Sequence, residues 1–380
     1  MKIFHLWKRR SQSEISNNKI YLGFVCHGGV GDMLIASLYI QELGKIINYP
    51  TQIDVYGYTN ETINTAIFSD NEYVDRLFLR NDSEKRATCY DMFCQINRFP
   101  HIDYVNEEKI KQLSPNLWNI IKSITSFRHH YSTVFDNAPF CNTQISLMCY
   151  LQGKKRLQVP DINGILGISE KTKLQISVKK NAKEILQLYG LNHINFITVH
   201  RGLDMNMGKD STKLWPVDHY NRLLAFIKKH YTTIKIVQLG ISDDRCPALE
   251  NIDINLVGKT NFEELKALVA KSSFHIDCEG GLVHLRHFLS GSPSCVLFGP
   301  TSSDVFGYSE NINLKSNHCK FWCEWLSPNW QNECFAGFKN PLCMKELNPE
   351  FVFNSIVAYL DYIKVKCCLL YTSPSPRDCS

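Results

Sequence analysis

Residues 274–301 constrain the fold of this chain more than any other stretch. They read FHIDCEGGLVHLRHFLSGSPSCVLFGPT. Residues 274–278 and 294–298 are short apolar runs typical of buried strands, and the apolar residues in 282–289 recur at helical spacing. Two glycines at 280–281 separate the first strand from the helix. The stretch therefore predicts a strand, a helix and a second strand, closed by a tight Gly-Pro loop.

The helix in this stretch begins directly on the glycine pair, and such a helix start can bind an anion. It offers unpaired backbone N–H groups and the positive end of the helix dipole. His284, in the first turn, could add a side-chain donor to a phosphate. An ordinary strand-to-helix connection, in which the glycines only make a tight turn, explains the same residues. These residues alone leave both interpretations open.

Strand and helix patterns alternate in two series along the chain. In the first series, a strand at 20–25 leads through a glycine-rich loop into a helix at 33–47. The second series begins near Asn181. Such alternation predicts parallel sheets covered by helices on both faces, and 380 residues suffice for two cores. We therefore predict one α/β domain in residues 1–180 and a second in residues 181–347.

The C-terminal residues predict a helix followed by a foreign tail. Residues 348–367 contain Pro349, which suits a helix start, and then a helical apolar pattern. Residues 368–378 read CLLYTSPSPRD, depart abruptly from that pattern and look like a translated sequencing adaptor. We therefore predict that 368–380 are not native and exclude them from the fold.

Asp32 is the strongest candidate for acid–base chemistry. It follows a glycine-rich loop at the mouth of the first predicted sheet, where α/β proteins place ligands. A carboxylate there could take the proton from an acceptor hydroxyl. The alternative is that Asp32 only caps the helix that starts beside it, and the residues alone do not decide between the two.

Three charged residues of the second series lie at the predicted carboxyl edge of its sheet, the side that binds ligands. Lys213 stands just before Trp215-Pro216 and places a point positive charge there. Arg201 ends a predicted strand, and Asp244 lies in the loop after the next strand, where an acid could bind a ribose hydroxyl. The alternatives are a surface lysine beside a core tryptophan and solvated loop acids.

Four of the fifteen cysteines are spaced like metal ligands. They form the pattern C-x3-C-x10-C-x8-C with Cys319, Cys323, Cys334 and Cys343. Two close pairs around a spacer are typical of a four-cysteine structural site for zinc or iron. Four buried thiols without a metal explain the same pattern. We predict a structural metal in the segment 319–343, with no part in catalysis.

Charge and apolar patterning exclude several other classes. The net charge of +5 is mild and no dense Lys/Arg run occurs, so we expect no nucleic-acid partner. No apolar window approaches the length of a membrane span, and the start MKIFHLWKRR is not a signal peptide. We therefore expect a cytoplasmic protein, with at most peripheral contact with the inner face of the cytoplasmic membrane.

The order of residues in 274–301 resembles the nucleotide-sugar site of glycosyltransferase family 9, the lipopolysaccharide heptosyltransferase family. The family pattern has an acidic residue, a small residue, glycine, an apolar pair and His-Leu, and then FGPT after the next strand. In this sequence the pattern is filled by Glu279, Gly280, Gly281, Leu282, His284, Leu285 and the FGPT of 298–301. The acidic residue of the family is usually Asp, so Glu279 is a departure that lengthens the side chain.

Three further positions support the resemblance. Gly31-Asp32 matches the N-terminal motif of the family, in which the Asp is thought to be the catalytic base. Lys213 matches the lysine of its Lys-x-Trp-Pro motif, which contacts donor phosphate. Arg201 stands where the family often has Pro. The resemblance covers roughly residues 20–360.

The resemblance implies the GT-B fold, with two Rossmann-like domains facing across a cleft and a C-terminal helix that returns to the first domain. It implies an inverting glycosyltransferase that moves a sugar, heptose from ADP-heptose, to a hydroxyl acceptor. The acceptor would be a glycolipid, such as lipopolysaccharide core, or a protein serine as in the related autotransporter heptosyltransferases, which carry a four-cysteine iron site. No Asp-x-Asp occurs in the sequence, so we expect metal-independent catalysis. A nucleotide-sugar epimerase and a non-catalytic GT-B-like binding module remain alternatives.

Overall fold

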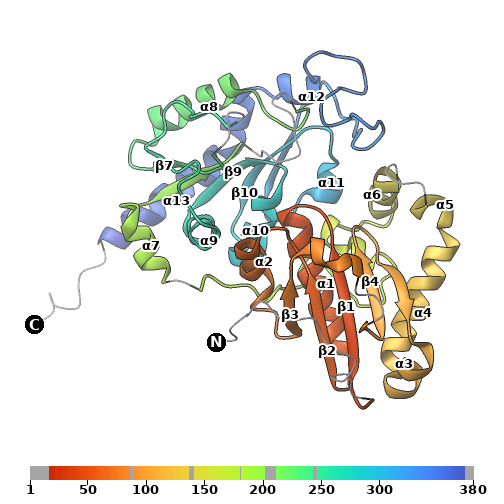
Figure 1. Cartoon of the computed structure of the whole chain (residues 1–380). Coiled ribbons are helices and arrows are strands. Elements are labelled where there is room, and N and C mark those ends of the chain that lie inside the picture. The colour runs from red at the N-terminus through yellow and green to blue at the C-terminus, as the bar shows by residue number, and fades with distance from the viewer. Residues whose placement is uncertain are drawn as a thin grey trace, which may run out of the picture. The chain divides into compact units, whose positions relative to one another are not determined.

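The structure of the chain is a computed structural model. It describes residues 17–85, 89–136, 141–179, 181–201, 211–242 and 246–372. The chain folds into two compact units (Figure 1). The first unit consists of Met1–Ser177, Asp304–Phe306 and Trp325–Pro328, and the second of Val178–Ser303, Gly307–Glu324 and Asn329–Ser380.

The first unit contains a five-stranded sheet in the order β3-β2-β1-β4-β5. Its strands are β1 (Ile20–Cys26), β2 (Thr51–Tyr56), β3 (Val74–Phe78), β4 (Met92–Ile96) and β5 (His101–Val105). The central strand β1 pairs in parallel with β2 and β4, whereas β5 runs antiparallel to β4 at the edge. Every residue of β1 is buried, as expected for a strand that helices cover on both faces.

Helices and short helical turns connect and flank these strands. They are α1 (Val30–Ile46), α2 (Glu61–Phe68), η2 (Arg80–Lys85), α3 (Glu107–Leu113), α4 (Pro115–His130), α5 (Ser132–Phe135), α6 (Cys141–Leu151) and η4 (Arg156–Asp161). Helix α1 follows β1 after a short turn in which Gly28 has φ of +104°. A side chain at Gly28 would also collide with the carboxylate of Asp32, so this turn requires glycine.

The second unit contains a six-stranded sheet in the order β11-β10-β9-β6-β7-β8, and all its strand pairs are parallel. Its strands are β6 (Phe196–Val199), β7 (Lys235–Gln238), β8 (Ile254–Asn255), β9 (Phe274–Cys278), β10 (Ser294–Phe298) and β11 (Ile312–Lys315). Its helices are α7 (Ala182–Leu188), α8 (Val217–His230), α9 (Phe262–Lys271), α10 (Gly281–Ser290), α11 (Ser303–Phe306), α12 (Leu342–Lys345) and α13 (Pro349–Thr372).

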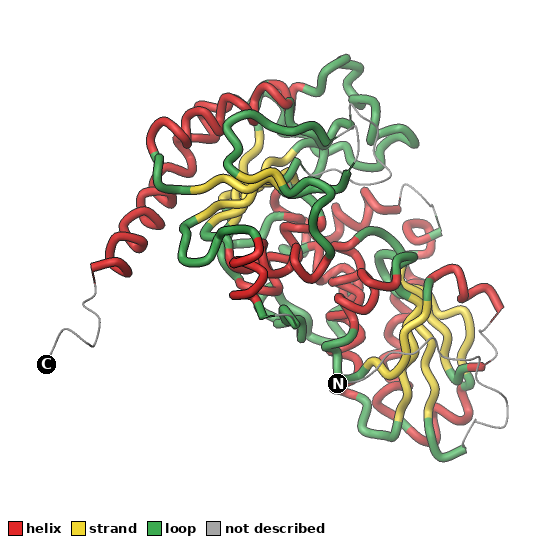
Figure 2. The backbone as a smooth tube through the Cα atoms, turned by 60° about the vertical axis from the view of Figure 1, so that its left-hand side comes forward, coloured by secondary structure: helices red, strands yellow, loops and turns green. Residues whose placement is uncertain are grey.

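Two apolar cores lie on opposite faces of the second sheet, beneath the helices that flank its strands (Figure 2). One core packs α8 and α13 on one face, and the other packs α9 on the opposite face. Asn261 caps α9, because its side chain accepts a hydrogen bond from the backbone N–H of Glu264. The alternation of strands and helices predicted for this half is confirmed.

The terminal helix α13 packs on the second unit, and its expected return to the first domain stays a prediction. Val352, Ile356 and Leu360 are fully buried in the core of the second unit. Tyr231 donates a hydrogen bond to Asp361 over 2.8 Å. The apolar face of α13 therefore packs against the sheet of its own unit. Helix α13 also continues to Thr372, beyond the predicted helix end at residue 367.

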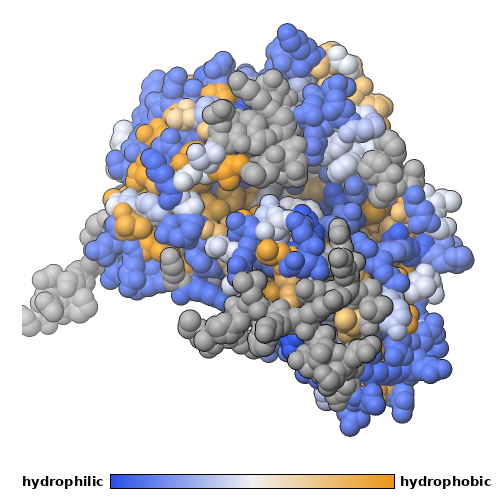
Figure 3. Space-filling view, viewed as in Figure 1, coloured by the Kyte–Doolittle hydropathy of each residue, from blue (hydrophilic) through white to orange (hydrophobic). Residues whose placement is uncertain are grey.

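Figure 3 shows the surface of one face, where the described residues are mostly hydrophilic and hydrophobic areas lie between them. Leu151 and Leu188, the most exposed large apolar side chains, belong to α6 and α7. None of the helices in the described ranges is both long and apolar enough to span a membrane.

Candidate active site

The carboxyl edge of the second sheet brings two predicted residues together. Lys213 lies in the loop before α8, and Glu279 follows β9 directly. Lys213 Nζ forms an ion pair with Glu279 Oε2, and the two side chains are only 11% and 7% exposed. This is the edge at which parallel α/β sheets bind ligands. The pair was not predicted as a contact, although both residues were predicted for the site.

The N-terminus of α10 lies next to this ion pair. Gly280 is the N-cap, and among the described residues no side chain caps the helix. The backbone does not require glycine at 280, because φ is −178° and an added Cβ would meet only the carbonyl oxygen of Cys278 at 3.7 Å. The absence of a side chain at Gly280, and at Gly281 after it, instead leaves the first N–H groups of the helix open to an anion.

His284 is held in the first turn of α10 by a buried aromatic residue. Its Nδ1 lies 2.5 Å from the hydroxyl of Tyr308. The ring of Tyr308 stacks on His287, with 3.6 Å between centroids and 5° between planes. The contact at Nδ1 fixes the orientation of the His284 ring. Leu282 is buried and belongs to the packing of the helix rather than to its polar start.

Two other residues predicted for this unit have different outcomes. Arg201 lies two residues after the end of β6, at the same edge of the sheet, and is only 9% exposed. Asp244 lies outside the described residues, so its predicted role in ribose binding stays a prediction.

In the first unit, Asp32 caps a helix and also forms an ion pair. It lies in the first turn of α1, next to the buried Gly31, and its Oδ2 accepts a hydrogen bond from Gly29 N over 3.0 Å. Its Oδ1 pairs with Arg156 of η4, whose side chain is 4% exposed. The side chain of Asp32 itself is 32% exposed. The capping interpretation is therefore correct, and the carboxylate still reaches the surface.

Arg156 was missed by the sequence reasoning. It lies 124 residues from Asp32 and belongs to no motif. The sequence offers one signal for Arg156. It follows two lysines, and the residues after it, up to Pro160, are mostly apolar.

Further cations lie at the same edge of the first sheet. Burial raises the pKa of Cys149 to about 11, and the nearby Arg156, Lys154 and Arg98 act against that increase. Burial lowers the pKa of His27, which follows β1, and Arg80 adds to that decrease. Arg80 follows β3 and Arg98 follows β4, so positive charges lie beyond the carboxyl ends of two strands of this sheet.

The four predicted metal ligands are neighbours but do not form a coordination site as they stand. The pKa of Cys343 is raised to about 12, by burial above all and also by the charges of Cys319, Cys323 and Cys334. Across the part of the chain that the structure describes, no three His, Cys, Asp or Glu side chains are placed to hold a metal ion. The predicted metal site stays a prediction.

Comparison with known families identifies the second half of the chain. Residues 200–337 match the family model of glycosyltransferase family 9 (heptosyltransferase). This part of the chain is similar to glycosyltransferase family 9. This match includes Arg201, Lys213 and the whole stretch 279–284, and it confirms both the predicted family and the predicted class of enzyme, a glycosyltransferase.

Solved structures of family 9 enzymes have the same fold. The ADP-heptose lipopolysaccharide heptosyltransferase II of E. coli is 14% identical with a TM-score of 0.56, and the alignment covers 91% of this chain and 100% of that one. A family 9 glycosyltransferase from Veillonella parvula is 14% identical with a TM-score of 0.54, over 90% of this chain and 97% of that one. Both likenesses confirm the GT-B-like α/β fold with two sheets.

A third similar structure is TibC, an iron-containing dodecameric glycosyltransferase from enterotoxigenic E. coli. It is 10% identical with a TM-score of 0.56, over 91% of this chain and 77% of that one. Among curated proteins, none matches the sequence.

Proposed function

We propose that this protein is an inverting glycosyltransferase that moves a sugar from a nucleoside diphosphate donor to a hydroxyl acceptor. The observation that carries the proposal is the ion pair of Lys213 and Glu279 beside the uncapped N-terminus of α10. A lysine and a row of open backbone N–H groups match the negative charge of a diphosphate. His284 adds a ring nitrogen in the first turn of the same helix.

The transfer step follows from these groups. The acceptor oxygen attacks the anomeric carbon from the face opposite the diphosphate, and the bond from that carbon to the phosphate oxygen breaks. The nucleoside diphosphate leaves with the electron pair, while Asp32 takes the hydroxyl proton of the acceptor. Lys213 and the α10 N-terminus offset the charge on the leaving group. The sequence holds no Asp-x-Asp, so we propose that the transfer needs no metal-bridged diphosphate.

ADP-heptose is the donor that we propose. The E. coli structure with a TM-score of 0.56 is an ADP-heptose transferase, and TibC has been solved in complex with ADP-D-beta-D-heptose. These likenesses concern the fold, so they support the choice of donor without fixing it.

An anionic glycolipid such as lipopolysaccharide core is the acceptor that we propose. The cations Arg80, Arg98 and Arg156 at the edge of the first sheet favour an acceptor that carries phosphate or carboxylate groups. A protein serine, the alternative acceptor, has no need of such charge. Transfer of sugar to this glycolipid would place the enzyme in the cytoplasm, at the inner face of the membrane.

A structural zinc or iron on the four cysteines belongs to the same proposal. The thiols would have to move closer together than they lie in the structure to share one ion, and they would lose their protons on binding. Elemental analysis should then find close to one metal per chain, and Cys319→Ser should lose it and melt at a lower temperature. A metal-free protein with full activity and four titratable thiols would rule this out.

The proposed function is tested by a binding screen followed by a transfer assay. Thermal shifts with ADP-, GDP-, UDP- and dTDP-sugars should show the largest rise in melting temperature with ADP-heptose. Release of ADP should then require a separate acceptor. An epimerase would convert the donor alone, and a binding module would shift the melting temperature without any turnover. Failure of all four nucleotide sugars to bind would contradict the proposal.

A further inference from the structure

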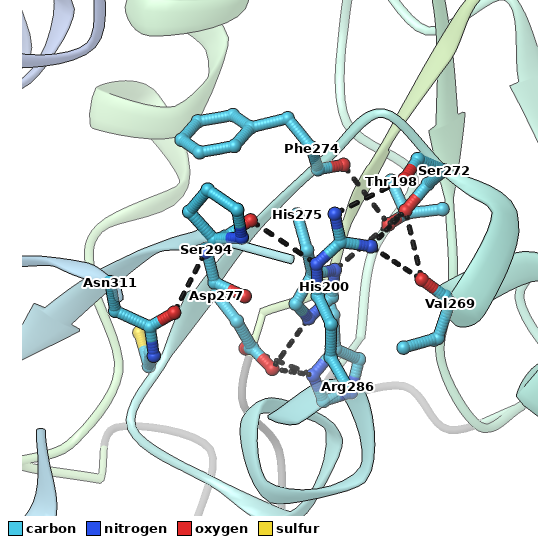
Figure 4. A network of polar contacts seen from close by, with 12 residues as sticks. Thr198, His200, Val269, Ser272, Phe274, His275, Asp277, Arg286, Ser294 and Asn311 are labelled. Atoms are coloured by element: carbon cyan, nitrogen blue, oxygen red, sulfur yellow. Dashed lines mark hydrogen bonds and ion pairs between the residues drawn. The ribbon is translucent and has the colours of Figure 1, made fainter. Parts of the chain in front are cut away.

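Four polar side chains lie together on one covered face of the second sheet, where apolar residues usually pack. Thr198 of β6 is in register with His275 of β9, Asp277 also belongs to β9, and His200 comes directly after β6 (Figure 4). We call these four residues the polar square. Three of them, Thr198, His275 and Asp277, have no exposed surface. Burying so much polarity in a sheet core is costly unless every group is paired.

Asp277 is the acceptor at the centre of the polar square. Both of its oxygens lie 3.0 Å from His200 Nδ1, and Oδ2 lies 3.3 Å from His275 Nε2. Burial opposes ionisation of this carboxyl group, but the two histidines outweigh burial and lower the pKa of Asp277. Burial lowers the pKa of His275, and its Nε2 faces the carboxylate. The carboxylate therefore holds both rings in fixed orientations.

The inner side of the polar square is anchored to α10. His275 Nδ1 lies 2.9 Å from the hydroxyl of Thr198, and that hydroxyl lies 3.1 Å from Ser272 Oγ. Arg286 of α10 donates to the same Ser272 Oγ over 2.7 Å. Arg286 has no exposed surface. An unbroken chain of hydrogen bonds thus links the body of α10, whose N-terminus forms the candidate diphosphate site, to Asp277.

The outer side of the polar square opens toward the ligand edge of the sheet. His200 is the only one of the four with exposed side-chain surface, at 12%. Its Cδ2, which is bonded to Nε2, lies 3.9 Å from where a Cβ of Gly240 would stand, just past the end of β7. Nδ1 faces Asp277 of β9, and the opposite edge of the ring faces Gly240, beyond the carboxyl end of β7. Arg201 follows it directly in the chain.

We propose that His200 binds a phosphate of the sugar-nucleotide donor and that Asp277 is its positioning residue. The inference rests on the proposed function, because it takes the donor to be a nucleoside diphosphate sugar. An imidazole can donate from both nitrogens only as an imidazolium, the form that a carboxylate on one side and a phosphate on the other both stabilise. His200 then joins Lys213 and the α10 N-terminus in offsetting the charge of the leaving diphosphate.

The decisive variant is His200→Asn. Its amide nitrogen can take the place of Nδ1 and keep the hydrogen bond to Asp277, while the Nε2 edge of the ring is deleted. Calorimetry should compare the tightest binder among ADP, GDP, UDP and dTDP with the nucleoside of the same base. We expect a roughly 10–100-fold loss of diphosphate affinity, as for a lost charged hydrogen bond, and an unchanged affinity for the nucleoside.

The positioning role of Asp277 is tested by Asp277→Asn. It should lower diphosphate affinity less than His200→Asn does, and the double variant should bind no more weakly than His200→Asn alone, because Asp277 acts through the ring. The matched control is Asp54→Asn in β2, which changes another buried strand carboxylate, one bonded to Tyr90 OH over 3.1 Å. This control should lower the melting temperature without changing diphosphate affinity.

The outcomes separate this inference from the proposed function. If the wild type binds no diphosphate and no nucleotide sugar, the proposed function fails. If the wild type binds and His200→Asn binds equally well, the phosphate role of His200 is wrong while the proposed function stands. Equal losses for diphosphate and nucleoside would also overturn that role. An Asp277→Asn variant that only melts earlier, like the control, would make Asp277 purely structural. His200→Asn decides the main point even if Asp277→Asn fails to fold.

Discussion

The carboxyl edges of the two sheets carry charge in different ways. At the second edge, the cation Lys213 is paired with Glu279 beside an open helix N-terminus. At the first edge, the carboxylate Asp32 is paired with a buried arginine, Arg156, and further cations lie nearby. Each edge therefore pairs an acidic side chain with a basic one. The group offered to a ligand is the carboxylate at the first edge and the helix N-terminus with its lysine at the second.

This difference indicates a division of labour. The Asp32 side chain is 32% exposed while its arginine partner is 4% exposed, so the first edge presents a carboxylate that can accept a proton. The second edge presents backbone N–H groups in addition to its lysine, which suits an anion. Substitutions at the two edges should therefore damage different steps of the reaction.

The largest effect is expected from Asp32→Asn. The amide oxygen can still accept the hydrogen bond from Gly29, so the start of α1 is preserved while the base is lost. Turnover in a transfer assay should fall by roughly 10²–10⁴, with the donor KM little changed. If the Asp32→Asn variant turns over at the wild-type rate, Asp32 serves only as a helix cap.

Lys213→Ala should weaken donor binding and slow transfer together. The lysine is expected to touch the diphosphate both before and during bond breaking, so roughly 10–100-fold should be lost from donor affinity. Isothermal titration with ADP-heptose measures this loss, and Lys213→Arg, which keeps the charge, serves as the control. Unchanged affinity in a well-folded Lys213→Ala protein would remove the residue from the site.

Gly280→Ala separates backbone strain from ligand approach. The extended backbone at 280 accepts any residue, and the new methyl group meets only Cys278 O at 3.7 Å, so the melting temperature should stay the same. The methyl group nevertheless stands before the first N–H groups of α10, and donor affinity should fall roughly tenfold. A variant that binds donor normally would show that the glycine serves only the turn.

Tyr308→Phe should have the smallest effect of the four. It removes the hydroxyl that holds His284 Nδ1 but keeps the ring that stacks on His287. Donor affinity should fall roughly 2–10-fold, in proportion to one neutral hydrogen bond. His284→Ala, made in both backgrounds, checks the mechanism, because Tyr308→Phe should add nothing once His284 is gone.

The sequence predicts the buried parallel strands well. Strands β9 and β10 have the predicted limits of 274–278 and 294–298, and α10 begins at the glycine pair as expected. Fully buried parallel strands read as continuous apolar runs, which is a strong signal. By contrast β5, an exposed antiparallel edge strand, has no such run and was not predicted.

The pairings within the site could not be read from the sequence. Arg156 and Asp32 are 124 residues apart in the sequence, and His200 and Asp277 are 77 residues apart. No local spacing therefore predicts either contact. The motif residues near Glu279 were predicted because they are contiguous in the chain. Their partners became visible only when the strands were placed side by side.

Hydrogen–deuterium exchange tests the division between the two edges most directly. Saturating ADP-heptose should slow exchange at the backbone amides of residues 279–284, because the diphosphate is expected to accept their hydrogen bonds. Exchange at residues 27–33, around Asp32, should stay as it is without ligand. Slower exchange confined to 27–33, or no change at either edge under conditions where ADP-heptose raises the melting temperature, would contradict the assignment of the donor to the second edge.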